Sequence, residues 1–353
     1  MTGGANMKVL VTGGAGFIGS AMVRLLIARG YDVVNVDALT YAADLANLTE
    51  IDKHPRYFFE HCDIRDQAGL DRVFETYKPK AIIHLAAETH VDRSISRPEK
   101  FVDTNVNGTL TLLECARRYW DNNGNAESFR FLHVSTDEVY GSVLLPGQFS
   151  EDSRYNPSSP YSASKAASDH LVQAWGKTYG LPVMLTHCTN NFGPRQTPDK
   201  LIPMAITQGL LNKPITIYGN GSNVRDWLYV EDHAEALLEV LSKGRIGQSY
   251  NIGGGQEFSN LSVAHKICAR LDDLRPEAAP HNRLLSFVQD RPGHDQRYSV
   301  STTRIQSELN WYPAITFDER LTDTVRWYWQ HQSRWRKSNT DGTPIKSRMG
   351  RVA

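Results

Sequence analysis

Two acidic residues stand side by side at a point where a buried strand is expected to end. Residues 134–141 read VSTDEVYG, and the mainly apolar run before them is typical of a core strand. Asp137 and Glu138 follow this strand directly. Two interpretations fit. The acids serve a turn or a helix cap, for which Asp is well suited, or they form a proton-transfer pair whose members ionise at different pH.

A tyrosine and a lysine form a second candidate set. Residues 161–165 read YSASK at the start of a predicted helix, so Tyr161 and Lys165 lie one turn apart on the same face. A lysine cation beside a phenol lowers the pKa of the phenol, which would let Tyr161 accept a proton near neutral pH. This spacing also arises by chance on solvated helices. Thr136, at the end of the preceding strand, favours the catalytic interpretation.

A glycine pattern lies near the N-terminus. Residues 11–20 read VTGGAGFIGS, which places Gly13, Gly16 and Gly19 between a predicted strand and a predicted helix. Glycines in this arrangement allow a tight turn, close approach of the backbone to a pyrophosphate and close packing of helix on strand. A merely flexible turn is the alternative. The flanking strand and helix favour a dinucleotide site.

An acid ends the second predicted strand. Asp37 stands where a carboxylate would accept hydrogen bonds from the hydroxyls of an adenosine ribose. Ala38 follows it, and no arginine is near enough in the sequence to meet a 2′-phosphate. The cofactor predicted from these residues is NAD rather than NADP.

Two later strand ends are expected to border the same cofactor. Asp63 and Ile64 follow the third strand and would flank the adenine. Leu85, Ala86 and Ala87 follow the fourth strand and would line the cofactor's path. Ordinary loop positions are the alternative for each.

Strands and helices alternate through the first half of the chain. We predict strands at residues 8–12, 32–37, 56–60, 81–85, 129–135 and 182–187, and helices at residues 17–28, 67–77, 98–119 and 161–179. This order indicates an α/β fold: a Rossmann-type, doubly wound parallel sheet with a smaller α/β substrate-binding domain. We place the NAD-binding domain at residues 7–187, with a returning segment near 226–252, and the substrate domain at 188–330. Residues 333–353 are expected to form a flexible tail.

Composition excludes several classes of protein. The chain has 353 residues and a formal net charge of zero, which argues against a nucleic-acid-binding surface. Its four cysteines and its histidines show no metal-ligand spacing, so no metal is expected. No apolar stretch is long enough to span a membrane, and no signal peptide is apparent, so we expect no membrane association and a cytoplasmic location.

The motifs together resemble the extended short-chain dehydrogenase/reductase family. The resemblance rests on TGGAGFIG, Thr136 and YSASK, and it runs from about Lys8 to about Gln330. Within that family the segments STDEVYG, AAETHVDRSI, NNFGPRQTPDKLIP, VRDWLYVEDH and DRPGHDQRY are similar to those of dTDP-glucose 4,6-dehydratases. The resemblance implies tightly bound NAD that is regenerated in each turnover, a nucleotide-sugar substrate, a homodimer formed through a helical bundle, and a role in deoxysugar biosynthesis.

The resemblance also gives the acidic pair a role. It implies that Tyr161, assisted by Lys165 and Thr136, takes the proton of the sugar C4 hydroxyl as the cofactor oxidises C4. Glu138 would then remove the C5 proton while Asp137 protonates the departing C6 oxygen. Return of the hydride to C6 would give a 4-keto-6-deoxy sugar, so the overall reaction is a dehydration.

The remaining site residues are also implied by the resemblance. The implied cofactor-binding set comprises Gly13, Gly16, Phe17, Ile18, Gly19, Asp37, Leu39, Thr40, Asp63, Ile64, Leu85, Ala86, Ala87, Thr104, Tyr161, Lys165 and Asn191. The implied substrate-binding set comprises Thr89, Thr136, Asn190, Lys200, Leu201, Tyr218, Arg225, Asn260, Arg291, His294 and Tyr298. The chemistry of these residue types supports part of the second set, because arginine is suited to bidentate binding of a diphosphate. A surface ion pair for Arg225 and simple packing for the tyrosines are the alternatives.

Other functions remain open from sequence alone. Thr89 and Phe192 stand where the family has Ser and Tyr, which leaves fine substrate preference undecided. An epimerase or decarboxylase acting on another nucleotide sugar is one alternative, although an epimerase has no water to expel and does not need the acidic pair. A cofactor-sensing regulator without catalysis is another, but such a protein would typically lose the Tyr–Lys pair or the acids. These residues together favour the dehydratase.

Overall fold

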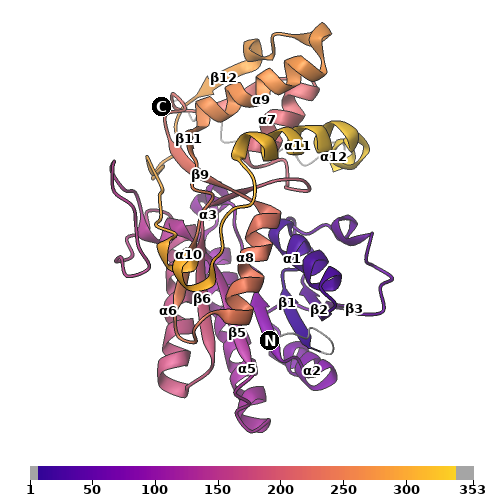
Figure 1. Ribbon diagram of the computed structural model, residues 1–353, viewed down its shortest axis with the longest axis vertical. Coiled ribbons are helices and arrows are strands. Elements are labelled where there is room, and N and C mark those ends of the chain that lie inside the picture. The colour runs from indigo at the N-terminus through magenta and orange to yellow at the C-terminus, as the bar shows by residue number, and fades with distance from the viewer. Residues whose placement is uncertain (1–6, 339–353) are drawn as a thin grey trace.

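A seven-stranded parallel sheet forms the centre of the larger part of the molecule (Figure 1). The structure is a computed structural model, and it describes residues 7–338. The strand order is β10-β6-β5-β4-β1-β2-β3. The strands are β1 (Lys8–Thr12), β2 (Asp32–Asp37), β3 (Tyr57–His61), β4 (Ala81–His84), β5 (Arg130–Thr136), β6 (Val183–Cys188) and β10 (Ser249–Ile252). The order reverses between β1 and β4, which is where ligands bind in open sheets of this kind.

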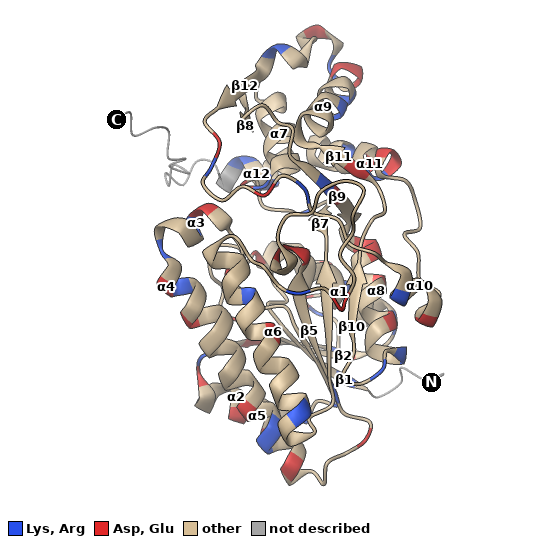
Figure 2. Ribbon diagram, turned by 90° about the vertical axis from the view of Figure 1, so that its left-hand side faces the viewer, with Lys and Arg blue, Asp and Glu red and all other residues tan. Residues whose placement is uncertain are grey.

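Helices cover both faces of this sheet, and each face has its own apolar core. On one face α1 (Phe17–Ala28) packs against α8 (Val230–Lys243), with α10 (Thr303–Leu309) beside α8. On the other face α2 (Gln67–Tyr77), α5 (Thr109–Asn122) and α6 (Pro160–Tyr179) pack in a row, as Figure 2 shows. Apolar residues alternate between the two cores along each strand because successive side chains point to opposite faces. The α/β doubly wound fold predicted from the sequence is confirmed.

A smaller lobe lies at the carboxyl edge of the sheet (Figure 1). It contains a three-stranded sheet, β11-β9-β7, and a two-stranded sheet, β12-β8. Its strands are β7 (Asn190–Phe192), β8 (Ile215–Tyr218), β9 (Val224–Tyr229), β11 (Glu257–Ser259) and β12 (Leu285–Val288). Its helices are α7 (Leu201–Leu210), α9 (Asn260–Leu274), α11 (Phe317–Gln330) and α12 (Gln332–Ser338), which share a third apolar core.

The chain crosses between the two parts more than once. Within residues 226–252, α8 and β10 pack on the large sheet, whereas β9 joins the three-stranded sheet of the smaller lobe. The chain returns again at α10, which contacts α8 and β10. Within the described range, no helix is long and apolar enough to cross a bilayer.

One predicted helix is interrupted. The sequence predicted a single helix at residues 98–119, but α4 (Pro98–Phe101) passes into a π-helical segment, Val102–Gly108, before α5 begins. Asn105 in this segment exchanges hydrogen bonds with the backbone of Glu88 and also donates to Ser164. The wider turn brings these contacts, and Thr104 nearby, to the edge of the site described below. Such π-helical segments are frequent at functional sites.

The predicted flexible tail is wrong in its first residues. Residues up to Ser338 form α12, and Trp335 is buried and donates a hydrogen bond to the carbonyl of Tyr328 at 2.9 Å. An indole that packs in an apolar core and satisfies its N–H in this way orders the helix around it. Residues 1–6 and 339–353 lie outside the described part of the chain.

Candidate active site

The glycine turn after β1 has the geometry that a bound pyrophosphate requires. Gly13 has φ +71°, and a Cβ there would approach the backbone of Ala86 at 2.8 Å. A Cβ on Gly19 would lie 2.0 Å from the carbonyl oxygen of Gly13, so α1 can sit this close to the turn only with glycine there. Gly16 is the N-cap of α1 and provides no side-chain cap. The first N–H groups of the helix therefore remain available to an anion.

Asp37 ends β2 beside this turn. Its carboxylate accepts hydrogen bonds from the backbone N–H groups of Ala15 at 2.9 Å and Leu39 at 2.8 Å. Burial raises the pKa of Asp37, and these two hydrogen bonds oppose the increase. The contacts fix the carboxylate at the wall of the cavity, as expected for a group that holds a ribose.

One large cavity connects the glycine turn with the acidic pair. Its volume is ≈ 690 Å³, and it is lined by all the predicted cofactor-binding residues except Leu39 and by all five predicted catalytic residues. Of the predicted substrate-binding residues, Thr89, Thr136, Asn190 and Lys200 line it. A dinucleotide and a sugar would therefore share one space.

The acidic pair lies in the first turn of a 3-10 helix, Asp137–Tyr140, which we call the acidic turn. Thr136 is its N-cap: Thr136 Oγ1 accepts from the N–H of Glu138 at 3.3 Å and donates to Asp137 Oδ1 at 3.4 Å. Asp137 is 3% exposed, and its other oxygen, Oδ2, is buried without a hydrogen-bond partner. Because Thr136 provides the cap, capping does not account for either carboxylate.

The two acids differ in their electrostatic environment. Burial raises the pKa of Asp137 well above its usual value, and the neighbouring Glu138 raises it further. Burial also raises the pKa of Glu138, but Arg291, Arg225 and Lys200 oppose that increase. A protonated Asp137 beside an ionised Glu138 is the arrangement that acid–base catalysis by this pair needs.

Tyr161 and Lys165 enter the cavity from the first turns of α6. Lys165 Nζ donates to the carbonyl of Val134 at 3.0 Å and lies 3.4 Å from His133 Nε2. We predicted that Lys165 would lower the pKa of Tyr161, and the structure contradicts this. Burial raises the pKa of the phenol well above its usual value, Glu138 raises it further, and a hydrogen bond with Thr136 opposes the shift.

The remaining predicted substrate residues extend from the cavity into the smaller lobe. Tyr298 Oη lies 3.5 Å from Glu138 Oε2, and the guanidinium of Arg225 sits over the Tyr298 ring at 4.2 Å. Tyr218 donates to Asp92 at 3.1 Å, and Arg291 lies 3.7 Å from the same carboxylate.

The other three lie at the margin of this group. His294 contacts the ring of Tyr218 edge-on, and Leu201 begins α7 directly after Lys200. Asn260 begins α9, where its backbone N–H donates to Asn223, and its side chain does not line the cavity.

Arg225, predicted to bind the diphosphate, is instead bonded to the protein backbone, and it is not on the surface as the alternative ion pair requires. It is 4% exposed and donates to the backbone carbonyls of Val224, Asp295 and Gln296. Its charge still acts on the acidic pair, because it is among the groups that lower the pKa of both acids. Direct bidentate contact with a diphosphate would require these backbone bonds to be exchanged.

Several cavity residues were not predicted. Tyr41, Arg93 and Gln196 line the cavity, and the guanidinium of Arg93 stacks over the ring of Tyr41 at 3.6 Å. Arg93 stands in the motif AAETHVDRSI, so its position was visible in the sequence. The stacking partner is 52 positions away, which gave no local signal.

Comparison with known proteins identifies the family. A family model described as GDP-mannose 4,6 dehydratase matches residues 10–324. A dTDP-glucose 4,6-dehydratase of Neisseria meningitidis is 54% identical, over 93% of this chain and 95% of the relative. The chain belongs to the dTDP-glucose 4,6-dehydratase family.

Solved structures of this family have the same fold. The dTDP-glucose 4,6-dehydratase of Streptomyces venezuelae, with NAD and TYD bound, matches with a TM-score of 0.87 and 44% identity, covering 94% of this chain and 99% of that one. The Bacillus anthracis dTDP-glucose 4,6-dehydratase, in complex with NAD, matches with a TM-score of 0.84 and 41% identity, covering 94% and 99%. The family resemblance predicted from the motifs is confirmed.

Proposed function

We propose that this protein is a hydro-lyase that converts dTDP-glucose to dTDP-4-keto-6-deoxyglucose, with NAD bound at the glycine turn, in deoxysugar biosynthesis. The observation that carries the proposal is the shared cavity, which joins a dinucleotide turn, a Tyr–Lys pair and an acidic pair. The first two suffice for oxidation of a hydroxyl. The acidic pair is needed only if water is also expelled.

The residues present fit NAD. The tight glycine turn, the uncapped N-terminus of α1 and the fixed carboxylate of Asp37 would hold its pyrophosphate and adenosine ribose. Bound NAD would supply the hydride chemistry, with one hydride taken from C4 and one returned to C6, so that none is consumed overall. The protein's own part is to orient the sugar and to move protons.

Tyr161 accepts the proton of the C4 hydroxyl. Burial raises the pKa of the phenol, so Tyr161 can accept this proton only after its own has been removed between turnovers. Thr136 offers a route for that proton once the elimination has left Asp137 ionised, because its hydroxyl is a hydrogen-bond partner of Tyr161 and donates to Asp137 Oδ1. Proton balance supports this route, since one turnover adds a proton at Tyr161 and removes one from Asp137.

The acidic turn carries out the elimination. The C4 ketone makes the C5 hydrogen acidic, and Glu138 removes it as the base. Asp137, protonated because it is buried beside Glu138, gives its proton to the C6 oxygen as the C6–O bond breaks and water leaves. Glu138 then returns a proton to C5. The site ends with one proton to be passed from Tyr161 to Asp137.

The smaller lobe supplies the groups for the nucleotide diphosphate. Lys200 lines the cavity and donates to the carbonyl of Thr89 at 3.2 Å, which places its ammonium beside the sugar end. Asn190 Oδ1 is buried without a hydrogen-bond partner, as expected of a group that a ligand completes. We assign this lobe to substrate binding and the seven-stranded sheet to NAD. Thymine as the base follows from the relatives' names.

The test is incubation of the purified protein with dTDP-glucose, without added reductant, followed by mass spectrometry. Loss of one water without net consumption of NAD supports the proposal, and Glu138→Gln should then abolish the conversion. An unchanged mass would turn the search to UDP-, CDP- and GDP-sugars. Failure with all of them would contradict the dehydratase and favour a cofactor-sensing regulator.

We also propose a homodimer formed through α5 and α6. The two helices pack side by side in Figure 2. Apolar side chains on them and on the π-helical segment before α5 are exposed: Val102 is 50% exposed, Leu110 36% and Tyr179 47%. Burying these side chains against a second copy would form a helical bundle. A monomeric mass in solution by light scattering would contradict this.

We propose a cytoplasmic location as well. The four cysteines lie within the described residues, and all are buried free thiols, as expected in a reducing compartment. Fractionation of cells that contain the tagged protein would test this, and recovery outside the cytoplasm would contradict it.

A further inference from the structure

Tyr140 is the last residue of the acidic turn and has no part in the chemistry described above. It is 1% exposed, and its ring stacks on Phe149 with centroids 5.4 Å apart. Its hydroxyl lies 3.1 Å from His187 Nδ1 and 3.0 Å from Asn251 Oδ1. Both partners are fully buried. A polar group is thus fixed at the inner end of the turn that carries Asp137 and Glu138.

The donors and acceptors around this hydroxyl form a consistent chain. Asn251 Nδ2 donates to the carbonyl of Phe149 at 3.2 Å, which fixes the amide with its oxygen toward Tyr140. That oxygen only accepts, so the Tyr140 O–H points to it and His187 Nδ1 donates to Tyr140. His187 Nε2 lies 2.7 Å from the hydroxyl of Tyr155 and 3.3 Å from Asp169 Oδ2 on the other side of the ring. Tyr155 and Asp169 thus hold the far side of the ring whose Nδ1 faces Tyr140.

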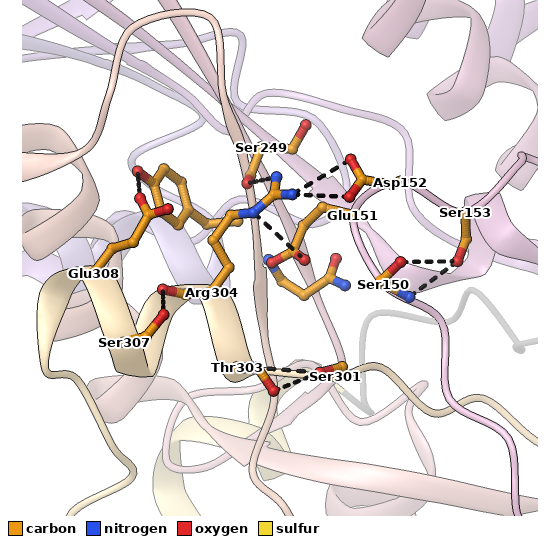
Figure 3. Close-up of polar contacts among 12 residues, drawn as sticks. Ser150, Glu151, Asp152, Ser153, Ser249, Ser301, Thr303, Arg304, Ser307 and Glu308 are labelled. Atoms are coloured by element: carbon orange, nitrogen blue, oxygen red, sulfur yellow. Dashed lines mark hydrogen bonds and ion pairs between the residues drawn. The ribbon is translucent and has the colours of Figure 1, made fainter.

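The anchor continues outward to the edge of the sheet. The backbone N–H of Asn251 donates to Glu151 Oε1 at 2.9 Å, and Arg304 Nε lies 3.8 Å from the other oxygen of Glu151. Figure 3 shows Arg304 reaching from α10 to Glu151, to Asp152 and to the carbonyl of Ser249. The hydroxyl of Tyr140 is therefore held through β6, through β10 and through the loop after the acidic turn.

The acidic turn has little freedom apart from this anchor. Thr136 caps one end, and Gly141 follows the other with φ +83°. A Cβ on Gly141 would lie 2.4 Å from the carbonyl oxygen of Asn156, so the chain leaves the turn in a tightly packed environment. Tyr161 and Lys165 lie on a different element, α6. The hydroxyl of Tyr140 is bonded to β6 and β10 rather than to Tyr161 or Lys165, and α6 reaches this anchor through Asp169 on the far side of His187.

We propose that Tyr140 is a positioning residue that holds Asp137 and Glu138 in register with C5 and C6, and that its hydroxyl serves the elimination but not the oxidation at C4. This inference rests on the proposed function. Elimination requires two carboxyl groups to act on adjacent carbons, and such geometry is sensitive to shifts of about 1 Å.

The test is Tyr140→Phe, which removes only the hydroxyl. If the proposal holds, kcat falls about tenfold or more while KM for dTDP-glucose changes by less than about twofold. C4 oxidation then outruns elimination, so the absorbance of reduced nicotinamide rises in the steady state. The matched control is Tyr250→Phe. Tyr250 precedes Asn251 on β10 and is as deeply buried as Tyr140. Its hydroxyl donates to Glu308 at 2.9 Å and takes no part in the hydrogen bonds around Tyr140. The control should show no build-up of reduced nicotinamide.

A second variant covers the possibility that Tyr140→Phe folds poorly. Asn251→Ala keeps the tyrosine hydroxyl but removes its acceptor, and it should give the same build-up of reduced nicotinamide to a smaller extent. An unchanged kcat in Tyr140→Phe, or a fall in kcat without that build-up, would overturn the proposal. The wild-type protein in the same assay tests the proposed function separately, because its failure to release water from dTDP-glucose would be visible without any variant.

Discussion

Asp137→Asn should make the protein more stable and nearly inactive. Asp137 is almost fully buried, and its pKa is raised well above the usual value by burial first and by Glu138 second. The folded state therefore holds a proton that the unfolded chain releases above its ordinary Asp pKa of about 3.9. As pH rises above that value, ionisation favours the unfolded wild type, and the free energy of unfolding falls.

Asparagine removes this penalty without changing the shape of the side chain. It does not ionise in either state, and it can keep the hydrogen bond from Thr136 to Oδ1. Each unit by which a pKa is raised corresponds to about 1.4 kcal/mol, so a rise of a single unit would give the variant about that gain in stability near pH 8. The melting temperature should then rise by about 1 to 2 °C or more. Below about pH 3.5 both proteins carry a neutral side chain in both states, and the difference should vanish.

The assay is thermal unfolding of both proteins, saturated with NAD, at a series of pH values, together with turnover of dTDP-glucose. Loss of a general acid lowers kcat by about 10² to 10⁴-fold. C4 oxidation does not need Asp137, so reduced nicotinamide should accumulate in the variant. A variant less stable than wild type near pH 8, or a gain that is the same at pH 5 and pH 8, would contradict a buried, protonated Asp137.

Substitutions at three further positions probe the site and the residues behind it. Thr136→Val should give one rapid turnover followed by slow ones, because the proton cannot pass from the phenol of Tyr161 to Asp137. Thr136→Ser keeps a hydroxyl and should show no such burst. Equal slowing of all turnovers in rapid-quench experiments would contradict proton transfer through Thr136. Asp169→Asn should destabilise the fold by about 3 to 5 kcal/mol at neutral pH. Burial opposes ionisation of Asp169, but hydrogen bonds from His133 and His187 outweigh this effect and hold its pKa below the usual value. The stability that the ionised carboxylate contributes should therefore be present above about pH 4 and lost as pH falls further. Urea unfolding at a series of pH values would show this loss. Asp37→Ala should lower the NAD content of the purified protein, measured after denaturation, and an unchanged content would show that the ribose contact contributes little.

Local patterns were enough to predict most of the first half of the fold. The helices at Phe17–Ala28 and Gln67–Tyr77 match their predicted bounds because their apolar residues repeat at helical spacing and each starts after a clear turn. The π-helical segment was not predictable in this way. Asn105 within it bonds to the backbone of Glu88, 17 positions earlier, and such a contact leaves no mark in the periodicity.

The chemistry of the site was predictable only where the signal lies within a few residues. The glycine turn, the acidic pair and the Tyr–Lys pair each occupy a short segment, and all three meet at one cavity. The pKa of Tyr161 was predicted in the wrong direction, because a four-residue spacing does not reveal how deeply a phenol is buried.

Long-range contacts were missed for the same reason. The anchor of Tyr140 depends on His187 and on Asn251, which is 111 positions away. The burial of Trp335 could not be inferred from a polar tail, since it depends on an apolar core formed by other helices. Sequence patterns therefore located the candidate catalytic residues but not the long-range contacts around them.

The most direct test of the proposed reaction follows the hydrogen atom on C4 of the sugar. The protein is given dTDP-glucose that carries deuterium at C4, and the product is analysed by mass spectrometry and NMR. The account predicts a product that has lost one water, keeps the deuterium and carries it at C6, because the same site oxidises C4 and reduces C6. A product of unchanged mass with deuterium still at C4 would indicate an epimerase, and loss of the deuterium to solvent would contradict direct transfer within one cavity.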